Sequence, residues 1–369
     1  MIRLSFVGDI ACDGVLIKAA RRGASYDFSR VFQTGNVFSD SDLVIGNLET
    51  YFSGKDFGNK LYQYWAPDSF CDAIKDAGFD IVGTANNHCM DGGVEGLKRT
   101  LKILDQRGIS HTGTFADDRE KRYLVVEVNG IKIAFVSVAH NLNTCYDSSM
   151  CEDVSRYVNT LGFKKGNYSK NPLKRWWQTS FSIRLGRLKR KLQFGSTMPA
   201  FTDQLTPGRI NPDWLSKIDA LMERARSEAD VLVALVHVGG QFNVEPGSFS
   251  QFVVEHLRQK GADVIAAHHP HCLQRMERLG DTYVAYSLGA FCISPSAAYL
   301  CKESLPEYGA AWHIDIDEET RSVKGTSVRI LKSIEDKDHY VHVVEAEEDS
   351  PQVRQIRTRL GLDRAEQNA

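Results

Sequence analysis

Five apolar runs in the chain are each followed at once by side chains that can bind a metal ion or move a proton. The runs are LSFV, LVIG, DIVGTA, VLVALV and DVIAA, and each has the length and composition of a buried strand. Carboxylate, amide and imidazole groups follow them, and together these groups suit Mn, Fe or Zn. In chain order the side chains are Asp9, Glu49, Asn87 with the adjacent His88, His237, and His269 with His271.

The chemistry depends on these side chains meeting at one place. In open α/β sheets, ligands bind beyond the carboxyl ends of the strands, so five strand ends deliver their side chains to one edge. Two metal ions about 4 Å apart are well held by a bridging carboxylate and a bridging water or hydroxide. Each motif alone is weak, since Gly-Asp after a strand is most often a turn and a buried histidine is usually a core residue. All five in one context predict a dinuclear metal site.

The elements that must position these groups alternate between strand and helix signals, so the fold class is α/β. Apolar residues at helical spacing predict a helix in each of four segments. The segment YLVVEVNGIKIAFVSVA predicts a hairpin that turns on Asn129 and Gly130, and a strand pair is expected from about Ala311. The predicted helices cover residues 68–79, 94–108, 212–227 and 250–261.

Composition limits the classes of protein that fit. The 369 residues are 42% hydrophobic, which suffices for one large domain or two ordinary ones. The formal charge of −2 gives no field that indicates nucleic acid. No apolar run reaches about 18 residues, and the N-terminus enters a strand without a cleavage signal, so we expect a cytoplasmic protein. Eight cysteines occur without any CxxC pair, which favours reduced, buried thiols.

A basic segment interrupts the α/β pattern. Residues 155–202 contain eleven Lys and Arg but no Asp or Glu, and the stretch from Lys174 to Phe194 has the spacing of a basic amphipathic helix. It fits a rim for a polyanionic substrate, a contact with anionic lipid, or a solvated helix packed on the domain. We expect one domain over residues 1–345 with an insertion at about 145–210. A charged tail, frayed from Glu345 onward, covers 346–369.

Several of these stretches resemble one known family. VGDI, DLVIGNLET, the segment around TANNHCMDGG with its following helix, VALVHVGG, KGADVIAAHHPHCLQ and YSLGAF are similar to the CapA family. Its members are capsule or poly-γ-glutamate biosynthesis proteins of the calcineurin-like metallophosphoesterase superfamily. The similarity covers most of residues 1–145 and 229–292. It implies a four-layer αββα sandwich of the metallo-dependent phosphatase type, with two divalent metal ions (Mn, Fe or Zn) at the sheet edge.

The resemblance also implies a role for each of the seven side chains. The chain departs from the superfamily at its first motif, which is usually Asp-x-His but reads Asp9-Ile10-Ala11 here. The imidazole ligand that this motif usually supplies is therefore missing. By this resemblance Asp9 and His271 bind one metal, Asn87, His237 and His269 bind the other, Glu49 bridges both, and His88 is the catalytic acid that binds neither.

Neighbouring residues have more than one interpretation. Asp91 can hydrogen-bond a histidine or the loop, or cap the next helix, and Asn47 can orient Glu49 or form a turn. His268 is expected to support the site or face the substrate rather than bind metal. The thiol of Cys89 is expected to be small buried packing. The remaining histidines that we expect to be structural are His111, His140 and His256.

Two functions follow from the resemblance and the residues. The first is a metal-dependent hydrolase in capsule or poly-γ-glutamate metabolism, in which a metal-bridging hydroxide attacks a phosphorus or carbonyl centre. Its partners would be an anionic polymer or a phosphorylated substrate, with no nucleic acid. The alternative is a non-catalytic polyanion-binding or assembly subunit of a capsule polymer synthesis complex, with a membrane-bound partner. His88 favours the enzyme, since a structural site has no use for a free acid.

Overall fold

The computed structural model describes residues 1–54, 64–140, 142, 154–162, 203–206, 208–297 and 299–362, and two large β-sheets dominate them. The first has eight strands in the order β18-β17-β16-β1-β4-β7-β8, with β15 also paired to β1. These are β1 Ile2–Ile10, β4 Leu43–Leu48, β7 Ile81–Gly83, β8 Ser110–Thr112, β15 Ala290–Cys292, β16 Tyr308–Asp317, β17 Ser322–Glu335 and β18 Val341–Glu345.

The second sheet has six strands in the order β13-β14-β12-β11-β10-β9. Two small ribbons, β2 with β3 and β5 with β6, lie outside the large sheets. The six strands are β9 Leu124–Val128, β10 Ile131–Ala139, β11 Val231–His237, β12 Val264–His268, β13 Met276–Leu279 and β14 Thr282–Ala285, and the ribbon strands are β2 Arg21–Arg22, β3 Ser25–Tyr26, β5 Tyr51–Phe52 and β6 Trp65–Ala66.

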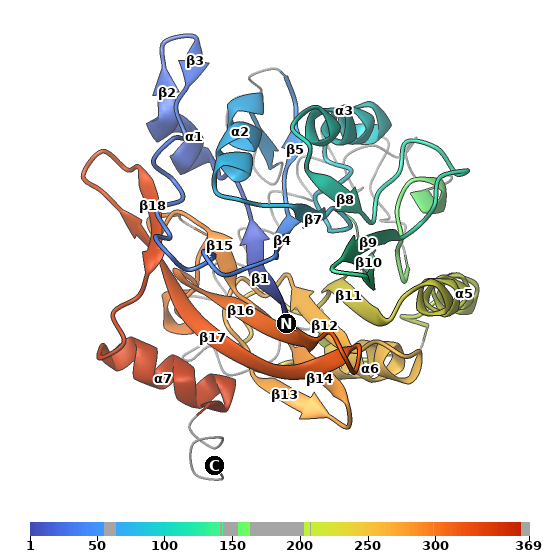
Figure 1. Ribbon diagram of the computed structural model, residues 1–369. Helices are drawn as coiled ribbons and strands as arrows, with labels where there is room; N and C mark the ends of the chain where they lie inside the picture. The colour runs from blue at the N-terminus through green and yellow to red at the C-terminus, as the bar shows by residue number, and fades with distance from the viewer. Residues whose placement is uncertain are drawn as a thin grey trace.

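Helices cover the outer faces of both sheets. In Figure 1, α2 and α3 lie over the first sheet, whereas α5 and α6 lie outside the second sheet, at the right of the view. One apolar cluster joins α1 and α2 to the first sheet, and another joins α5 and α6 to the second. The described α-helices are α1 Gly14–Ala20, α2 Asp68–Asp76, α3 Gly93–Gln106, α5 Pro212–Glu228, α6 Ser248–Gln259 and α7 Pro351–Leu360.

Strand β11 is buried on both faces, which explains the apolar run that precedes His237. Val231, Val233 and Leu235 face a cluster between the two sheets, which we call the inter-sheet core. The alternate residues Leu232 and Ala234 face the cluster beneath α5 and α6. Because successive side chains of a strand point to opposite faces, burial on both faces produces a continuous apolar run.

The α/β class is confirmed by this arrangement. The hairpin is also confirmed, since β9 and β10 pair antiparallel across Asn129 and Gly130, which have φ values of 49° and 78°. Positive φ at both central residues is what the turn of a two-residue hairpin requires. The four predicted helices correspond to α2, α3, α5 and α6, with ends shifted by a few residues.

The C-terminal prediction is wrong for residues 351–360, which form α7 rather than a frayed tail. The Ser350 side chain caps the start of the helix, and Gly361 ends it with a φ of 82°. Val353, Ile356 and Leu360 pack into the inter-sheet core. The charged residues between them hid this apolar face in the sequence.

We therefore expect Ile356→Ala to destabilise the whole protein. The Ile356 side chain is fully buried, and truncating a buried isoleucine typically costs about 2–5 kcal/mol of unfolding free energy. Chemical denaturation would measure the change, with the exposed Gln355→Ala on the same helix as the control. Equal stability of the two variants would show that α7 adds nothing to the core.

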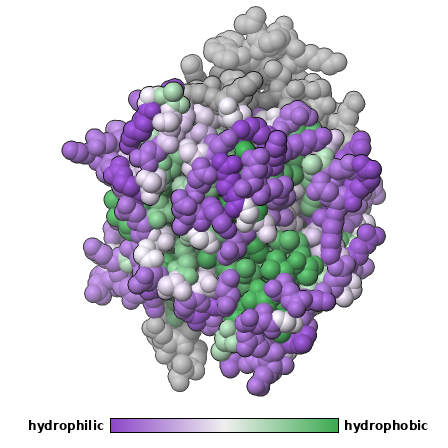
Figure 2. Space-filling view, turned by 45° about the horizontal axis from the view of Figure 1, so that its top comes forward, coloured by the Kyte–Doolittle hydropathy of each residue, from purple (hydrophilic) through white to green (hydrophobic). Residues whose placement is uncertain are grey.

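The surface and the remaining predictions complete the fold. The face shown in Figure 2 is mostly hydrophilic, with an apolar patch in its lower half. Among the described residues, no helix has the length and apolar character needed to cross a membrane. The predicted basic helix from Lys174 to Phe194 lies outside the described residues, as does most of the predicted insertion.

Candidate metal centre

The carboxyl ends of five parallel strands meet at one edge of the two sheets. In the first sheet β1, β4 and β7 run parallel, and in the second β11 and β12 do. Hydrogen bonds from His268 and His269 help to join the sheets at this edge. The His268 ring donates from Nε2 to Val7 O at 3.2 Å, and the His269 N–H donates to Asp9 Oδ2 at 3.1 Å. His268 therefore supports this edge through a contact with β1.

Two groups of side chains at this edge can hold a metal ion. Asp9, Glu49 and His271 form one group, and Glu49, His237 and His269 form the other, with the ligand atoms of each within 4.8 Å of one another. Glu49 belongs to both groups, which is the position of a shared ligand. The exposed fraction of Asp9, Glu49, His237 and His271 is at most 1%.

Each oxygen of Glu49 faces a different group. Oε2 lies 3.6 Å from Nδ1 of His271, which is also 3.0 Å from Oδ2 of Asp9. Oε1 lies 3.5 Å from Nε2 of His237. That same Nε2 is 3.0 Å from Nδ1 of His269 and 2.8 Å from Oδ1 of Asn87. The six side chains predicted to bind metal thus lie together at this edge of the sheets.

Unsatisfied polar atoms test whether these residues fit a cation. Both oxygens of Glu49 and both ring nitrogens of His271 are buried, and none of the four atoms makes a hydrogen bond among the described residues; the 3.0 Å approach of His271 Nδ1 to Asp9 is a close contact without hydrogen-bond geometry. Leaving such groups unpaired costs about 1–3 kcal/mol each, and more when they are charged. A divalent cation between the two residues would satisfy oxygen and nitrogen together, so the residues fit metal ions.

The pKa values of the cluster agree with this fit. Burial, with the nearby charges of Asp9 and Asp91, raises the pKa of Glu49 well above its usual range. Burial and the neighbouring imidazoles lower the pKa of His237 and of His269, so both rings stay neutral. Neutral imidazole is the form that binds metal, and a bound cation would favour the charged form of Glu49.

Asn47 holds two of the predicted ligands in place. Its Nδ2 donates to Asp9 Oδ1 at 2.7 Å and lies 3.2 Å from Nδ1 of His237. The sequence left open whether this amide orients Glu49 or forms a turn, and instead it links β1 to β11. Although burial would raise the pKa of Asp9, contacts with His271, His268 and Asn47 lower it, so its carboxylate is charged.

His88 lies beside the two groups but belongs to neither. Its Nδ1 is 2.7 Å from Oδ2 of Asp91, and its Nε2 is 3.9 Å from Oε1 of Glu49. Because a carboxylate only accepts, Nδ1 carries a hydrogen and Nε2 is directed to the metal centre. Asp91 also accepts from the backbone N–H of Tyr64 at 3.0 Å. The imidazole that Asp91 orients is therefore that of His88 and not that of a predicted metal ligand.

Two tyrosines that the sequence analysis missed lie over this part of the site. The Tyr64 ring centroid is 4.3 Å from that of His88, and its hydroxyl hydrogen-bonds to Tyr299. Burial and the charge of Glu49 raise the pKa of Tyr64. The tyrosines come from segments far apart in the chain, so no pattern in the sequence indicated them.

The loop after β12 has an unusual backbone that turns both imidazoles inward. His269 and His271 have φ values of 101° and 52°, which residues other than glycine rarely adopt. The N–H of Phe242 donates at 2.7 Å to the carbonyl oxygen of Pro270, which lies between the two histidines in the sequence, and so holds the loop in place. Strain of this kind persists where the surrounding structure holds it, and it is concentrated at functional sites.

Two glycines allow the chain to pass close behind Asp9. A Cβ on Gly8 would lie 2.0 Å from Gly289 O, and Asp9 N–H donates to that same oxygen at 3.0 Å. The motifs VGD and SLGAF therefore form one contact that positions Asp9. Substitution of Gly8 would therefore displace the Asp9 carboxylate.

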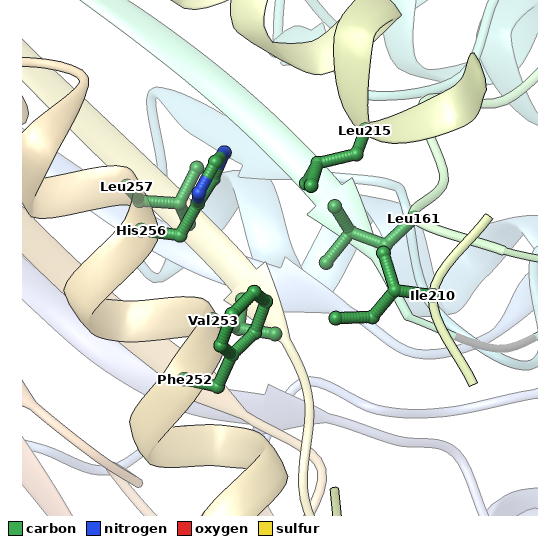
Figure 3. A pocket seen from close by; sticks show the side chains of 7 residues that line it. All are labelled: Leu161, Ile210, Leu215, Phe252, Val253, His256 and Leu257. Carbon is green, nitrogen blue, oxygen red and sulfur yellow. The ribbon is translucent and has the colours of Figure 1, made fainter. Parts of the chain in front are cut away.

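A separate hollow between α5 and α6 has a different character. Figure 3 shows that its lining is apolar apart from His256. That ring hydrogen-bonds to Asp219 at 2.6 Å, in agreement with the structural role that we expected for it.

The cysteines that the structure describes are free thiols, and the Cys89 side chain is buried, with its pKa raised to about 12 by burial. Neither feature provides a second metal site.

Fold and site define an α/β protein that gathers buried carboxylates and imidazoles able to hold metal ions at one sheet edge. Its family is that of the bacterial capsule synthesis protein PGA_cap, whose model matches residues 3–295, and the chain belongs to this family.

Relatives and a solved structure give the range of similarity. The PGA biosynthesis protein CapA of Bacillus subtilis (strain 168) is 27% identical over 297 residues, which are 79% of this chain and 63% of that protein. The capsule biosynthesis protein CapA of Bacillus anthracis is 26% identical over 79% of this chain and 59% of its own length. The chain thus spans less than two thirds of either relative. A hypothetical protein from Thermus thermophilus has a TM-score of 0.47 at 14% identity, covering 90% of this chain and 99% of that one.

Proposed function

We propose that the chain is a metal-dependent hydrolase that uses two divalent cations, Mn, Fe or Zn, in the metabolism of capsule or poly-γ-glutamate. One observation carries the proposal. Glu49 is buried, one of its oxygens faces His237 and the other faces His271, and neither oxygen has a hydrogen-bond partner among the described residues. A single carboxylate shared in this way is typical of two-metal hydrolases.

The side chains have distinct tasks under this proposal. Asp9 and His271 hold one cation, Asn87, His237 and His269 hold the other, and Glu49 is common to both. When bound, the two cations activate water and stabilise negative charge on a phosphoryl or carbonyl oxygen.

His88 supplies the proton in this scheme. Its Nε2 lies beside the shared carboxylate, and Asp91 accepts a hydrogen bond from its Nδ1. The Asp91 carboxylate stabilises the imidazolium and keeps Nε2 directed at the leaving group. His88 is therefore proposed as the general acid.

The substrate class comes from the family. Its named relatives are biosynthesis proteins of capsule and PGA, so an anionic polymer or a phosphorylated precursor suits the site. The two sheets with helices on both outer faces fit the four-layer αββα sandwich of the metallophosphoesterase type. A membrane-bound partner of polymer synthesis belongs to the proposal as well, as the resemblance to the CapA family implies.

Metal content and hydrolysis together test the function. We expect about two Mn, Fe or Zn per chain in protein purified without chelator, and loss of metal in Asp9→Ala and His269→Ala. The loaded protein should hydrolyse a phosphomonoester, a phosphodiester or a γ-glutamyl amide, and a chelator should stop the reaction. Failure to take up metal even after reconstitution contradicts the proposal. Metal uptake without hydrolysis of any of these bonds would favour the non-catalytic polyanion-binding subunit.

A further inference from the structure

His140 lies beside the second group of possible ligands, which consists of Glu49, His237 and His269, and Arg209 contacts His140. Neither residue has a part in the function proposed above. The backbone N–H of His140 donates to His237 O at 3.0 Å, and its ring centroid is 5.9 Å from that of His269. On its far side, Nε2 of His140 is 3.3 Å from Nη2 of Arg209. The guanidinium is thus one side chain away from two of the metal ligands. Our prediction that His140 is simply structural did not foresee this position.

The Arg209 guanidinium is held without a carboxylate. Its Nη1 donates to Gln204 O at 2.6 Å, and its Cζ lies 3.9 Å from the centre of the Phe249 ring. Guanidinium groups only donate, so Nε2 of His140 accepts from Nη2. These contacts fix the orientation of the fork and leave N–H donors for a further acceptor.

Asp203 is the acidic residue near Arg209, and its oxygens are used elsewhere. Oδ2 accepts from the N–H of Gly247 at 2.6 Å, and Oδ1 accepts from the N–H and hydroxyl of Ser250 at 3.0 and 2.7 Å. Asp203 therefore caps α6. Among the described residues, no carboxylate forms an ion pair with Arg209, and burial lowers the pKa of this guanidinium. A partly buried cation of this kind is costly unless an anion accompanies it.

His140 lies beside the partly exposed member of the second group of possible ligands, His269. His140, Arg209 and His269 are partly exposed, whereas Asp9 and Glu49 are fully buried. Arg209 and His269 are therefore both partly accessible to solvent.

We propose that Arg209, oriented by His140, forms an anion-binding subsite that holds a carboxylate or phosphate group of the substrate next to the bond that is cleaved. The subsite rests on the proposed hydrolytic function. A planar fork with several donors suits the two oxygens of either anion. It would select substrates with a negative charge adjacent to the reacting centre, as both a γ-glutamyl unit and a phosphodiester backbone have.

The test compares anion affinity in Arg209→Gln and wild type, both loaded with metal. Titration calorimetry with inorganic phosphate and with glutamate should show affinity about 10- to 100-fold weaker in the variant. The probe that loses more affinity identifies the preferred anion. Arg209→Lys should recover only part of it, since lysine keeps the charge but not the fork. Metal content must match wild type, which separates a failed subsite from a failed metal centre.

Arg122→Gln is the matched control. Arg122 is also partly buried, donates to the carbonyl oxygens of Ser155 and Arg156, and lies 4.6 Å over the Phe115 ring. Its loss should leave affinity for both anions unchanged. Equal affinity in wild type and Arg209→Gln, or the same loss in Arg122→Gln, would overturn the subsite. If Arg209→Gln does not fold, unreduced affinity for both probes in a folded Arg209→Lys variant overturns it instead.

Discussion

Replacing His88 with alanine is expected to lower turnover by about 10²- to 10⁴-fold, the range typical for loss of a general acid. The metal content should remain that of the wild type, because His88 belongs to neither ligand group. The physical reason is the direction of its Nε2, which lies 3.9 Å from the carboxylate of Glu49 while Asp91 holds Nδ1. Elemental analysis and steady-state kinetics on the same samples would measure both quantities.

His111→Ala is the control for this experiment. His111 pairs with Asp105 at 3.1 Å near the end of α3, so its loss should change neither turnover nor metal content. Wild-type turnover in His88→Ala would refute the acid role. A parallel loss of metal and activity would instead make His88 part of the ligand set.

Glu49→Gln is expected to remove both metal ions, whereas His271→Gln should remove only one. Glutamine keeps the shape of the side chain but provides one neutral oxygen, so it can no longer face both histidine groups with charge. The shared position of Glu49 is what distinguishes it from the ligands that belong to one group. Metal per chain, measured by elemental analysis, would fall towards zero in the first variant and towards half in the second.

The exposed Glu95→Gln on α3 controls for the loss of one negative charge. It should keep the full metal content. If Glu49→Gln retained one metal, Glu49 would serve a single site, and the two groups would not share a ligand.

Although Glu49→Gln is expected to abolish metal binding, it should stabilise the metal-free protein at neutral pH. Burial raises the pKa of Glu49 in the fold, whereas the unfolded carboxyl titrates near 4.5. The folded state therefore binds the proton more tightly, and the wild type loses stability as pH rises above 4.5, at up to about 1.4 kcal/mol per pH unit. Glutamine does not titrate, so the metal-free variant should be the more stable one at neutral pH, with little difference below pH 4.5. Denaturation of metal-free samples at several pH values measures this difference.

Much of the candidate site was predictable because its residues follow strands that are apolar throughout. A strand buried on both faces has a strong signal in the sequence, and the carboxyl ends of parallel strands meet at one edge. For this reason Asp9, Glu49, Asn87, His237 and His269 were expected together, although they are spread over most of the chain. The hairpin at Asn129 was equally predictable, since its turn needs only local backbone conformations.

Other features depend on contacts that no local pattern encodes. The Asn47 amide contacts Asp9 and His237 rather than Glu49, because the parallel pairing of β1 with β4 brings it there. Helix α7 was hidden because three apolar residues among charges were too few to indicate burial. The position of Arg209 beside His140 required the packing of α6 against the second sheet.

The sequence by itself determined the α/β class, the strands, the types of side chain at their ends and membership in a family. It could do so because strand burial and turn chemistry are local properties that each segment carries on its own. Only the tertiary structure decided that the two oxygens of Glu49 face different groups of possible ligands, that Asp91 orients His88, and that the Arg209 guanidinium contacts His140. Those relations depend on angles and distances of a few ångströms between distant segments, which only the packing of the two sheets fixes.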